Sequence, residues 1–150
     1  MRLLLALFAL SALAADTKPD FSGVWKLAVA RSDFGNAPAP QSMLTQIDHK
    51  EPEILVRSKI TGPQGAYNSE YRYVTDGREN TNTIRGNEIK SRATWDGSTL
   101  KVTARAAGQG GVQVEFVDQW ALSADRKTLT MIREISAPQG RVQQRYVYEK

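Results

Sequence analysis

Residues 53–77 read EILVRSKITGPQGAYNSEYRYVTDG, and this stretch decides the fold class. Two runs rich in Ile, Val and Tyr alternate apolar and polar residues with a period of two, which is typical of half-buried strands. The sequence GPQG at 62–65 separates the runs and Asp76-Gly77 ends the second. Both are turn sequences that tolerate a positive φ. The stretch therefore predicts an antiparallel β-hairpin.

The same pattern continues from Phe21 to the C-terminus, and helical spacing is not sustained anywhere. We predict strands at 21–28, 42–49, 53–61, 66–75, 79–84, 87–95, 99–107, 112–122, 127–136 and 141–149. Connections this short join only antiparallel neighbours, because a parallel crossover needs about a dozen residues or more. A long antiparallel meander protects its edges by closing on itself. The prediction is an all-β, up-and-down antiparallel β-barrel of about 8–10 strands.

One connection is longer than the others. Residues 29–41 separate the first strand from the rest and contain Pro38 and Pro40, which exclude a long helix. We expect a partly ordered flap here, in the position of a lid.

The N-terminal sequence MRLLLALFALSALAA has the order of a secretory signal. Arg2 supplies the positive charge, an apolar run follows, and Ala12-Leu13-Ala14 supplies the cleavage pattern. The run is shorter than the roughly 20 apolar residues that span a bilayer. We predict a signal peptide at 1–14, a barrel domain at 15–150, and a secreted or periplasmic protein with no stable membrane insertion after cleavage.

Composition excludes several kinds of site. The 150 residues contain no Cys and one His, so disulfides, thiolate metal sites and multi-histidine metal sites are excluded. The net charge is +4, but the basic residues are scattered among acidic ones and form no stripe for nucleic acid. We expect no metal, no cofactor, no nucleic-acid partner and a monomer.

His49 is the residue that an enzyme hypothesis would need. It lies beside Asp48 and near Glu51, and a histidine next to an acid can serve as a general base. A surface position at the end of a strand is the expected alternative. We therefore predict no catalytic residue.

Alternation also assigns residues to the barrel interior. Small inward residues leave volume unfilled, and two Tyr-x-Tyr pairs bring hydroxyl groups to apolar walls. The residues expected to line a binding site are Tyr71, Tyr73, Tyr146, Tyr148, Phe116, Ser91 and Ala104, with Arg133 and Asp118 as a cross-strand ion pair or as polar ligand contacts. This pattern favours a cavity for a small apolar or amphipathic molecule. The alternative is a filled core, which would suit an envelope-associated interaction or inhibitor module that binds through its loops.

The opening strand DFSGVWKL at 20–27 resembles the Gly-x-Trp strand of the calycin superfamily, which includes the lipocalins and the fatty-acid-binding proteins. Ser32-Asp33-Phe34 and the ending YVYE at 146–149 are similar to the fatty-acid-binding group. From Phe21 to Lys150 the chain also looks like bacterial secreted proteins described as lipocalin-like.

The resemblance implies structural roles at the base of the barrel. Trp25 would close the base beside Gly23, and Arg145 or Arg141 would stack over the tryptophan by a cation–π contact. Two departures separate the chain from fatty-acid-binding proteins. Their carboxylate-holding Arg-x-Tyr is Tyr146-x-Tyr148 here, so Arg145 is one position off and should point outward. The flap also replaces their helix-turn-helix lid. Fatty acid is therefore not implied as the ligand.

Overall fold

The structure is a computed structural model that describes residues 17–150, so the predicted signal peptide lies outside the described residues. Ten antiparallel strands form one sheet in the order β4-β3-β2-β1-β10-β9-β8-β7-β6-β5. The strands are β1 (Gly23–Leu27), β2 (Ser42–Lys50), β3 (Glu53–Gly62), β4 (Gly65–Val74), β5 (Asn80–Ile84), β6 (Asn87–Asp96), β7 (Thr99–Ala107), β8 (Gln113–Leu122), β9 (Thr128–Ala137) and β10 (Gly140–Glu149). The predicted all-β, up-and-down architecture is confirmed.

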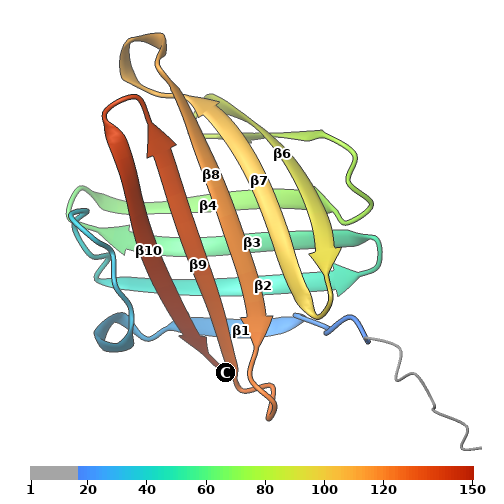
Figure 1. Ribbon diagram of the computed structural model, residues 1–150. Helices are drawn as coiled ribbons and strands as arrows, with labels where there is room; N and C mark the ends of the chain where they lie inside the picture. The colour runs from blue at the N-terminus through green and yellow to red at the C-terminus, as the bar shows by residue number, and fades with distance from the viewer. Residues whose placement is uncertain (1–16) are drawn as a thin grey trace, which may run out of the picture.

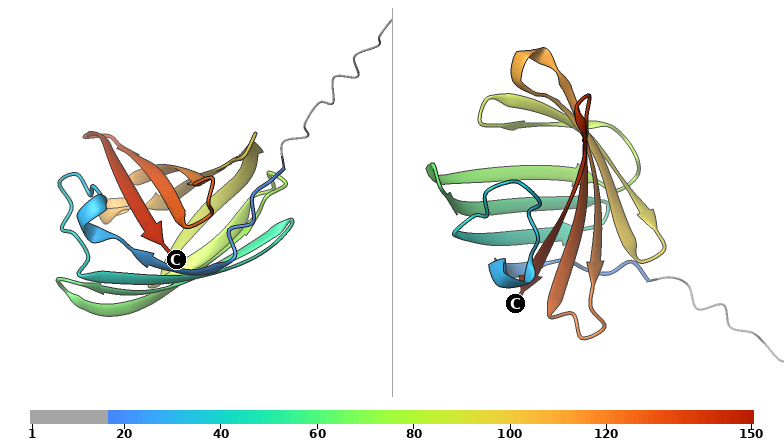
Figure 2. Two further views of the ribbon diagram at one scale, coloured as in Figure 1. Left: turned by 90° about the horizontal axis from the view of Figure 1, so that it is seen from below. Right: turned by 60° about the vertical axis from the view of Figure 1, so that its left-hand side comes forward.

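The short strand β1 closes the barrel. It pairs with β2 along four residues and with β10 at Lys26↔Glu149 and Leu27↔Tyr148, so the first and last strands meet. In Figure 1, β1–β4 run across the picture while β6–β10 cross them at a steep angle. The views in Figure 2 show these two layers lying face to face. The inward faces of both layers therefore enclose one interior.

The barrel is not hydrogen-bonded all the way round, because β4 and β5 form no ladder in the described chain. Side-chain amides replace the ladder at one point. Asn82 accepts a hydrogen bond from the backbone N–H of Arg72 (2.8 Å) and donates one to its carbonyl (3.0 Å). Asn82 is buried, so this amide satisfies backbone groups that would otherwise lack partners in the gap.

The ten predicted strands match the observed ones to within two residues at each end. The largest difference is at the start, where β1 begins at Gly23 rather than at Phe21. Side chains occupy the pairing positions there. The Ser22 hydroxyl accepts from the N–H of His49 (3.0 Å) and donates to its carbonyl (3.2 Å), and the N–H of Phe21 donates to His49 Nδ1 (3.2 Å).

The predicted flap at 29–41 is more firmly attached than expected. Val29–Arg31 form one 3-10 turn, and Asp33 and Arg145 exchange backbone hydrogen bonds of 2.8 and 2.7 Å. Phe34 is buried and packs edge-on against Tyr146, with 5.3 Å between ring centroids. The first half of the segment is therefore part of the barrel wall, held on β10, and not a partly ordered flap.

Candidate functional site

The base of the barrel is filled by aromatic rings. Phe21 and Trp25 have no exposed surface, and Phe21 stacks on Trp95 and packs edge-on against Trp120 at centroid distances of 5.7 and 5.8 Å. The indole N–H of Trp25 donates to the Phe21 carbonyl (2.9 Å). This end of the interior has no room for a ligand.

The cation over Trp25 is Lys150, so the expectation of Arg145 or Arg141 was wrong. Lys150 Nζ lies 4.8 Å from the centre of the Trp25 ring system. Arg145 points outward, as its parity requires, and donates to the Arg31 carbonyl (3.3 Å). A Cβ at Gly23 would lie 2.8 Å from Lys150 Cε, and Gly23 has a φ of +141°. The φ value favours glycine at position 23, and a side chain there would also displace the flexible end of Lys150.

His49 is a structural residue, not a surface one as expected. Its side chain is only 3% exposed and stacks against Phe21 at 5.7 Å. Because Nδ1 accepts from the Phe21 N–H, the proton of the neutral ring lies on Nε2, which donates to Glu51 (2.8 Å). Both ring nitrogens are therefore used inside the base, and none faces the cavity described below.

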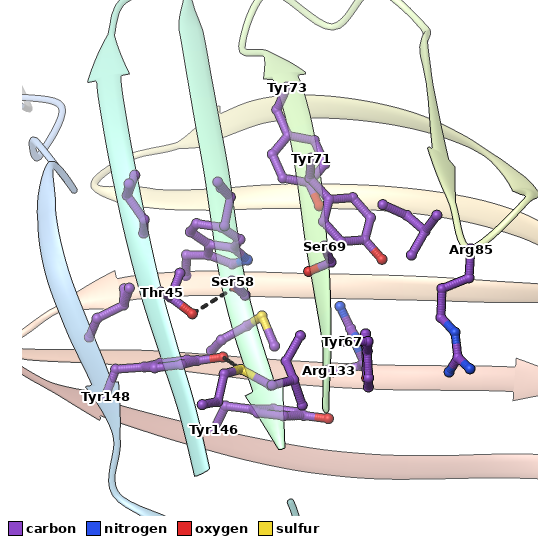
Figure 3. Close-up of a pocket in the computed structure, with 18 residues that line it drawn as sticks. Thr45, Ser58, Tyr67, Ser69, Tyr71, Tyr73, Arg85, Arg133, Tyr146 and Tyr148 are labelled. Carbon is purple, nitrogen blue, oxygen red and sulfur yellow. Dashed lines mark hydrogen bonds between the residues drawn. The ribbon is translucent and has the colours of Figure 1, made fainter. Parts of the chain in front are cut away.

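Above this base the interior is hollow. A cavity of about 250 Å³ lies between β2–β4 on one side and β8–β10 on the other. Figure 3 shows the side chains that enclose it. The lining residues are Met43, Thr45, Ile47, Val56, Ser58, Ile60, Tyr67, Ser69, Tyr71, Tyr73, Ile84, Arg85, Trp120, Leu129, Met131, Arg133, Tyr146 and Tyr148. The cavity is mostly apolar, with hydroxyls and two guanidinium groups in its wall.

The two predicted Tyr-x-Tyr pairs form facing parts of the wall. Tyr71 and Tyr73 stack with 5.9 Å between centroids on β4, and Tyr146 and Tyr148 stack with 6.4 Å on β10. Burial raises the pKa of all four phenols, so they stay neutral near physiological pH and act as hydrogen-bonding groups.

The tyrosine hydroxyls differ in whether a protein group satisfies them. Tyr146 donates to Gln144 Oε1 (2.9 Å) and Tyr148 contacts Met43 Sδ (3.4 Å). Within residues 17–150, no hydrogen-bond partner is found for the hydroxyls of Tyr71 and Tyr73. The β4 side of the cavity therefore has free hydrogen-bonding capacity.

Asp118 and Arg133 form the predicted cross-strand ion pair. They are register partners on β8 and β9, and Arg133 Nε and Nη2 donate to the two carboxylate oxygens at 2.8 and 2.7 Å. Burial by itself would lower the pKa of Arg133, but the adjacent carboxylate outweighs this and raises it. The guanidinium faces the cavity wall while Asp118, 3% exposed, lies behind it. The pair presents a polar but neutral surface.

Trp120 is a wall residue that the sequence reading did not assign to the site. It is 5% exposed, and its ring packs edge-on against both Phe21 and Tyr73. Its indole N–H has no hydrogen-bond partner among the residues that the structure describes. Buried donors are normally paired, so this unpaired N–H needs an explanation.

Four of the predicted site residues do not line this cavity: Asp118, which lies behind Arg133, and three residues of β6–β8. Ser91, Ala104 and Phe116 form one row across β6, β7 and β8 and border a separate depression with Arg92 and Arg105. Phe116 instead contacts the guanidinium of Arg133, 5.4 Å from the ring centroid. A period of two assigns a residue to a face of the sheet but not to a height along the barrel, which is why these positions were misplaced.

The mouth of the cavity contains another residue that the sequence analysis did not assign to the site. Arg85, in the turn between β5 and β6, lines both the cavity and an outer hollow at its mouth. This outer hollow is bordered by the proline part of the 29–41 segment and by the β3–β4 turn. One signal was available, because Arg85 precedes Gly86 at a turn position that usually carries Asn or Gly.

Two other kinds of feature are absent from residues 17–150. Across positions 17–150, no three His, Asp or Glu side chains are grouped so that they could hold a metal ion. The same stretch contains no helix with the length and apolar character of a membrane span.

Comparison with known proteins identifies the fold. No protein-family model matches the chain, and no curated protein is significantly similar in sequence. Solved structures are similar. A secretory abundant heat soluble protein of Ramazzottius varieornatus aligns with a TM-score of 0.61 and 16% identity over 91% of this chain and 99% of that one. Secretory abundant heat soluble protein 4 of the same organism aligns with a TM-score of 0.59 and 17% sequence identity. The alignment covers 87% of this chain and 94% of that one.

A third similar structure is the ligand-free lipid binding protein 8 of Caenorhabditis elegans, with a TM-score of 0.56 and 11% identity over 87% of this chain and 94% of that one. At these identities the similarity shows the fold alone. The fold is a nearly closed, up-and-down barrel of ten antiparallel strands, similar to the barrels of these proteins.

Proposed function

We propose that this protein binds a small, largely apolar molecule inside its barrel. The observation that carries the proposal is the cavity of about 250 Å³ directly above a solid aromatic base. Because the base of the same barrel is tightly packed, the cavity is a local feature of the interior and not a sign of loose packing throughout the core. The proposal also agrees with what the name of the similar Caenorhabditis elegans barrel says of that protein, which binds lipid.

The size of the cavity limits the ligand. At roughly 30 Å³ per molecule it has the volume of about eight waters, below the range of about 300–1,000 Å³ for sites that hold drug-sized ligands. A compact ring system suits this volume better than a long extended chain. Apolar burial at roughly 25 cal/mol per Å² gives such a ligand several kcal/mol, which corresponds to micromolar to millimolar affinity.

The polar groups of the wall define where the ligand needs oxygen or nitrogen atoms. The Tyr71 and Tyr73 hydroxyls are free on the β4 side of the cavity, while the unpaired Trp120 N–H is fully buried on the facing β8 side, among the described residues. An oxygen atom on the ligand accepts a hydrogen bond from one of these tyrosine hydroxyls, since a polar group left unpaired by a bound ligand costs free energy. The ligand is therefore apolar with at least one hydrogen-bond acceptor.

Calorimetry with naphthalene-2-carboxamide tests this proposal. The probe is a flat, neutral ring system with one carbonyl acceptor. We expect the purified protein to bind it, and Ser69→Leu, which fills the cavity from β4, to abolish binding. The matched control is Asn68→Leu on the same strand, because Asn68 is exposed and does not line the cavity. Absence of binding by the unmodified protein, or equal binding by Ser69→Leu, would contradict an internal site.

The proposal includes export of the protein, based on the signal pattern at residues 1–14. Expression of the full chain in a bacterium followed by intact mass measurement tests this part. We expect the mature protein in the periplasm or medium, with Ala15 as its first residue. Native mass spectrometry of the same material will show whether a small molecule is retained. An uncleaved protein confined to the cytoplasm would contradict export without affecting the binding proposal.

A further inference from the structure

The two arginines of the cavity wall differ in whether their charge is balanced. Arg133 is held by both oxygens of Asp118, and its guanidinium also lies 5.8 Å from the ring centroid of Tyr146. A ligand anion placed against Arg133 would meet the Asp118 carboxylate directly behind it. The inner arginine is therefore a poor partner for a negative charge.

The charge of Arg85 is not balanced. Within residues 17–150 no carboxylate lies within salt-bridge distance of its guanidinium, which instead lies 4.9 Å from the centre of the exposed Tyr67 ring. No Asp or Glu from this described part of the chain lines the cavity or its mouth either. The local field at the entrance is thus positive.

The backbone at Arg85 does not itself favour an arginine. Arg85 has a φ of +51° and the following Gly86 has a φ of +80°, so both central residues of the β5–β6 turn are left-handed. Such turns favour Asn, Asp or Gly at the first position, because a long side chain gains nothing there and costs strain. Turn geometry therefore does not account for an arginine at position 85.

Arg85 lies at the entrance of the cavity. It lines both the cavity and the outer hollow, and Met43, Ile60, Tyr67 and Tyr146 are likewise shared between the two. Figure 3 shows Arg85 on one side of the enclosed space, away from Tyr73 and Tyr148. A molecule that fills the cavity and projects through the mouth passes this guanidinium.

We propose that the ligand is a small amphipathic carboxylate, bound with its apolar part in the tyrosine-lined cavity and its anionic group outward against Arg85. This inference rests on the proposed function and adds the charge and the orientation of the ligand. Arg85 can provide two parallel N–H donors for a carboxylate, since its side chain is exposed at the mouth and only its guanidinium carbon is placed over a neighbouring ring, that of Tyr67.

The test compares naphthalene-2-carboxylate with the neutral naphthalene-2-carboxamide by calorimetry. The two probes have the same ring system and differ in charge. We expect the unmodified protein to bind the carboxylate about fivefold more tightly, as suits one partly exposed ion pair. Added salt should reduce this preference. Arg85→Gln should remove the preference for the carboxylate, while Arg85→Lys should retain most of it.

Arg126→Gln is the matched control. Arg126 also has a left-handed φ (+59°) in a β-turn and is exposed, but it lines neither the cavity nor its mouth. This variant removes the same charge and should keep the preference for the carboxylate.

The possible outcomes separate the two proposals. If neither probe binds the unmodified protein, the binding function itself fails and this inference fails with it. If the carboxamide binds equally well, the cavity binds ligands but Arg85 does not recognise an anion. A preference that survives Arg85→Gln would place the anion elsewhere and overturn the inference, and so would an equal loss for both probes.

Discussion

The base and the hollow end belong to one barrel, yet one is solid and the other encloses a cavity. At the base Phe21 and Trp25 fill the cross-section and have no exposed surface. At the hollow end the inward positions of β3 and β4 carry Ser58 and Ser69, which are register partners. Both ends follow the same alternation of inward and outward residues. The volume of the inward side chains, and not the pattern, separates a core from a cavity.

The two regions also treat their polar groups differently. At the base Glu51 accepts hydrogen bonds from Thr75 (2.7 Å) and Trp95 (3.0 Å) in addition to His49. In the cavity wall the donor of Trp120 is left without a partner within the described chain. A fully hydrogen-bonded network stabilises one arrangement of the side chains. A polar group without a partner in a cavity wall instead gains a hydrogen bond when a ligand supplies one. The contrast predicts that mutations at the base change stability and mutations in the cavity change binding.

Trp25→Ala should produce the largest effect on stability. Removing a fully buried indole leaves a large void, which costs about 3–5 kcal/mol. The measurement is the free energy of unfolding from urea denaturation. Val24→Ala is the control on the same strand, where the side chain is 55% exposed and the expected change is within about 0.5 kcal/mol. Equal losses for the two variants would show that the base is not the stabilising region.

Asp118→Ala should have the next largest effect and would alter the cavity as well. It leaves the Arg133 cation partly buried and unpaired, at a cost of about 3 kcal/mol. The freed guanidinium should also raise the affinity of the cavity for naphthalene-2-carboxylate. Asp118→Ala combined with Arg133→Met removes both charges and should recover most of the stability. A double variant no more stable than Asp118→Ala would contradict the ion-pair explanation.

A pair of enlarging substitutions compares the two regions directly. Ala93→Leu adds volume where no surface is exposed and should destabilise the protein by about 1–3 kcal/mol, because a packed core resists extra atoms. Ser69→Leu adds similar volume at the cavity and should change stability by less than about 0.5 kcal/mol. Thermal unfolding of both variants measures the difference. A similar loss for Ser69→Leu would show that the cavity has no free space.

Glu51→Gln should have the smallest effect, visible as a change in pH dependence. Burial raises the pKa of Glu51, but hydrogen bonds from His49, Thr75 and Trp95 outweigh this and hold the pKa below its ordinary value of 4.5. The folded state therefore favours the ionised group, whose stabilisation is present above pH 4.5 and disappears as the pH falls through the lowered pKa.

Urea unfolding of Glu51→Gln and of the unmodified protein at neutral and acidic pH measures this contribution. The unmodified protein should be more stable near neutral pH, and the two should converge in acid. Other carboxylates with lowered pKa values, such as Asp76 and Asp125, contribute equally to both proteins and cancel in the comparison. A difference that stays constant with pH would show that the ionisation of Glu51 does not stabilise the fold.

The sequence predicted the strands and most facing residues because these depend on local rules. Alternation with turn residues between the runs placed all ten strands, and it placed both Tyr-x-Tyr pairs on the cavity wall. Shared parity on neighbouring strands was enough to predict the Asp118–Arg133 pair. The errors arose where a contact joins residues distant in the chain. Lys150 replaces the expected arginine over Trp25, and His49 is buried by Phe21 and Trp95, which the sequence does not place beside it.

The sequence by itself determined the number of strands and their inward faces, because side-chain period and turn chemistry act between near neighbours. Only the tertiary structure decided where the interior is empty, which arginine keeps an unbalanced charge, and which predicted residues lie beside the cavity. Those properties depend on the height of each residue along the barrel axis, which strand tilt and closure set for the sheet as a whole.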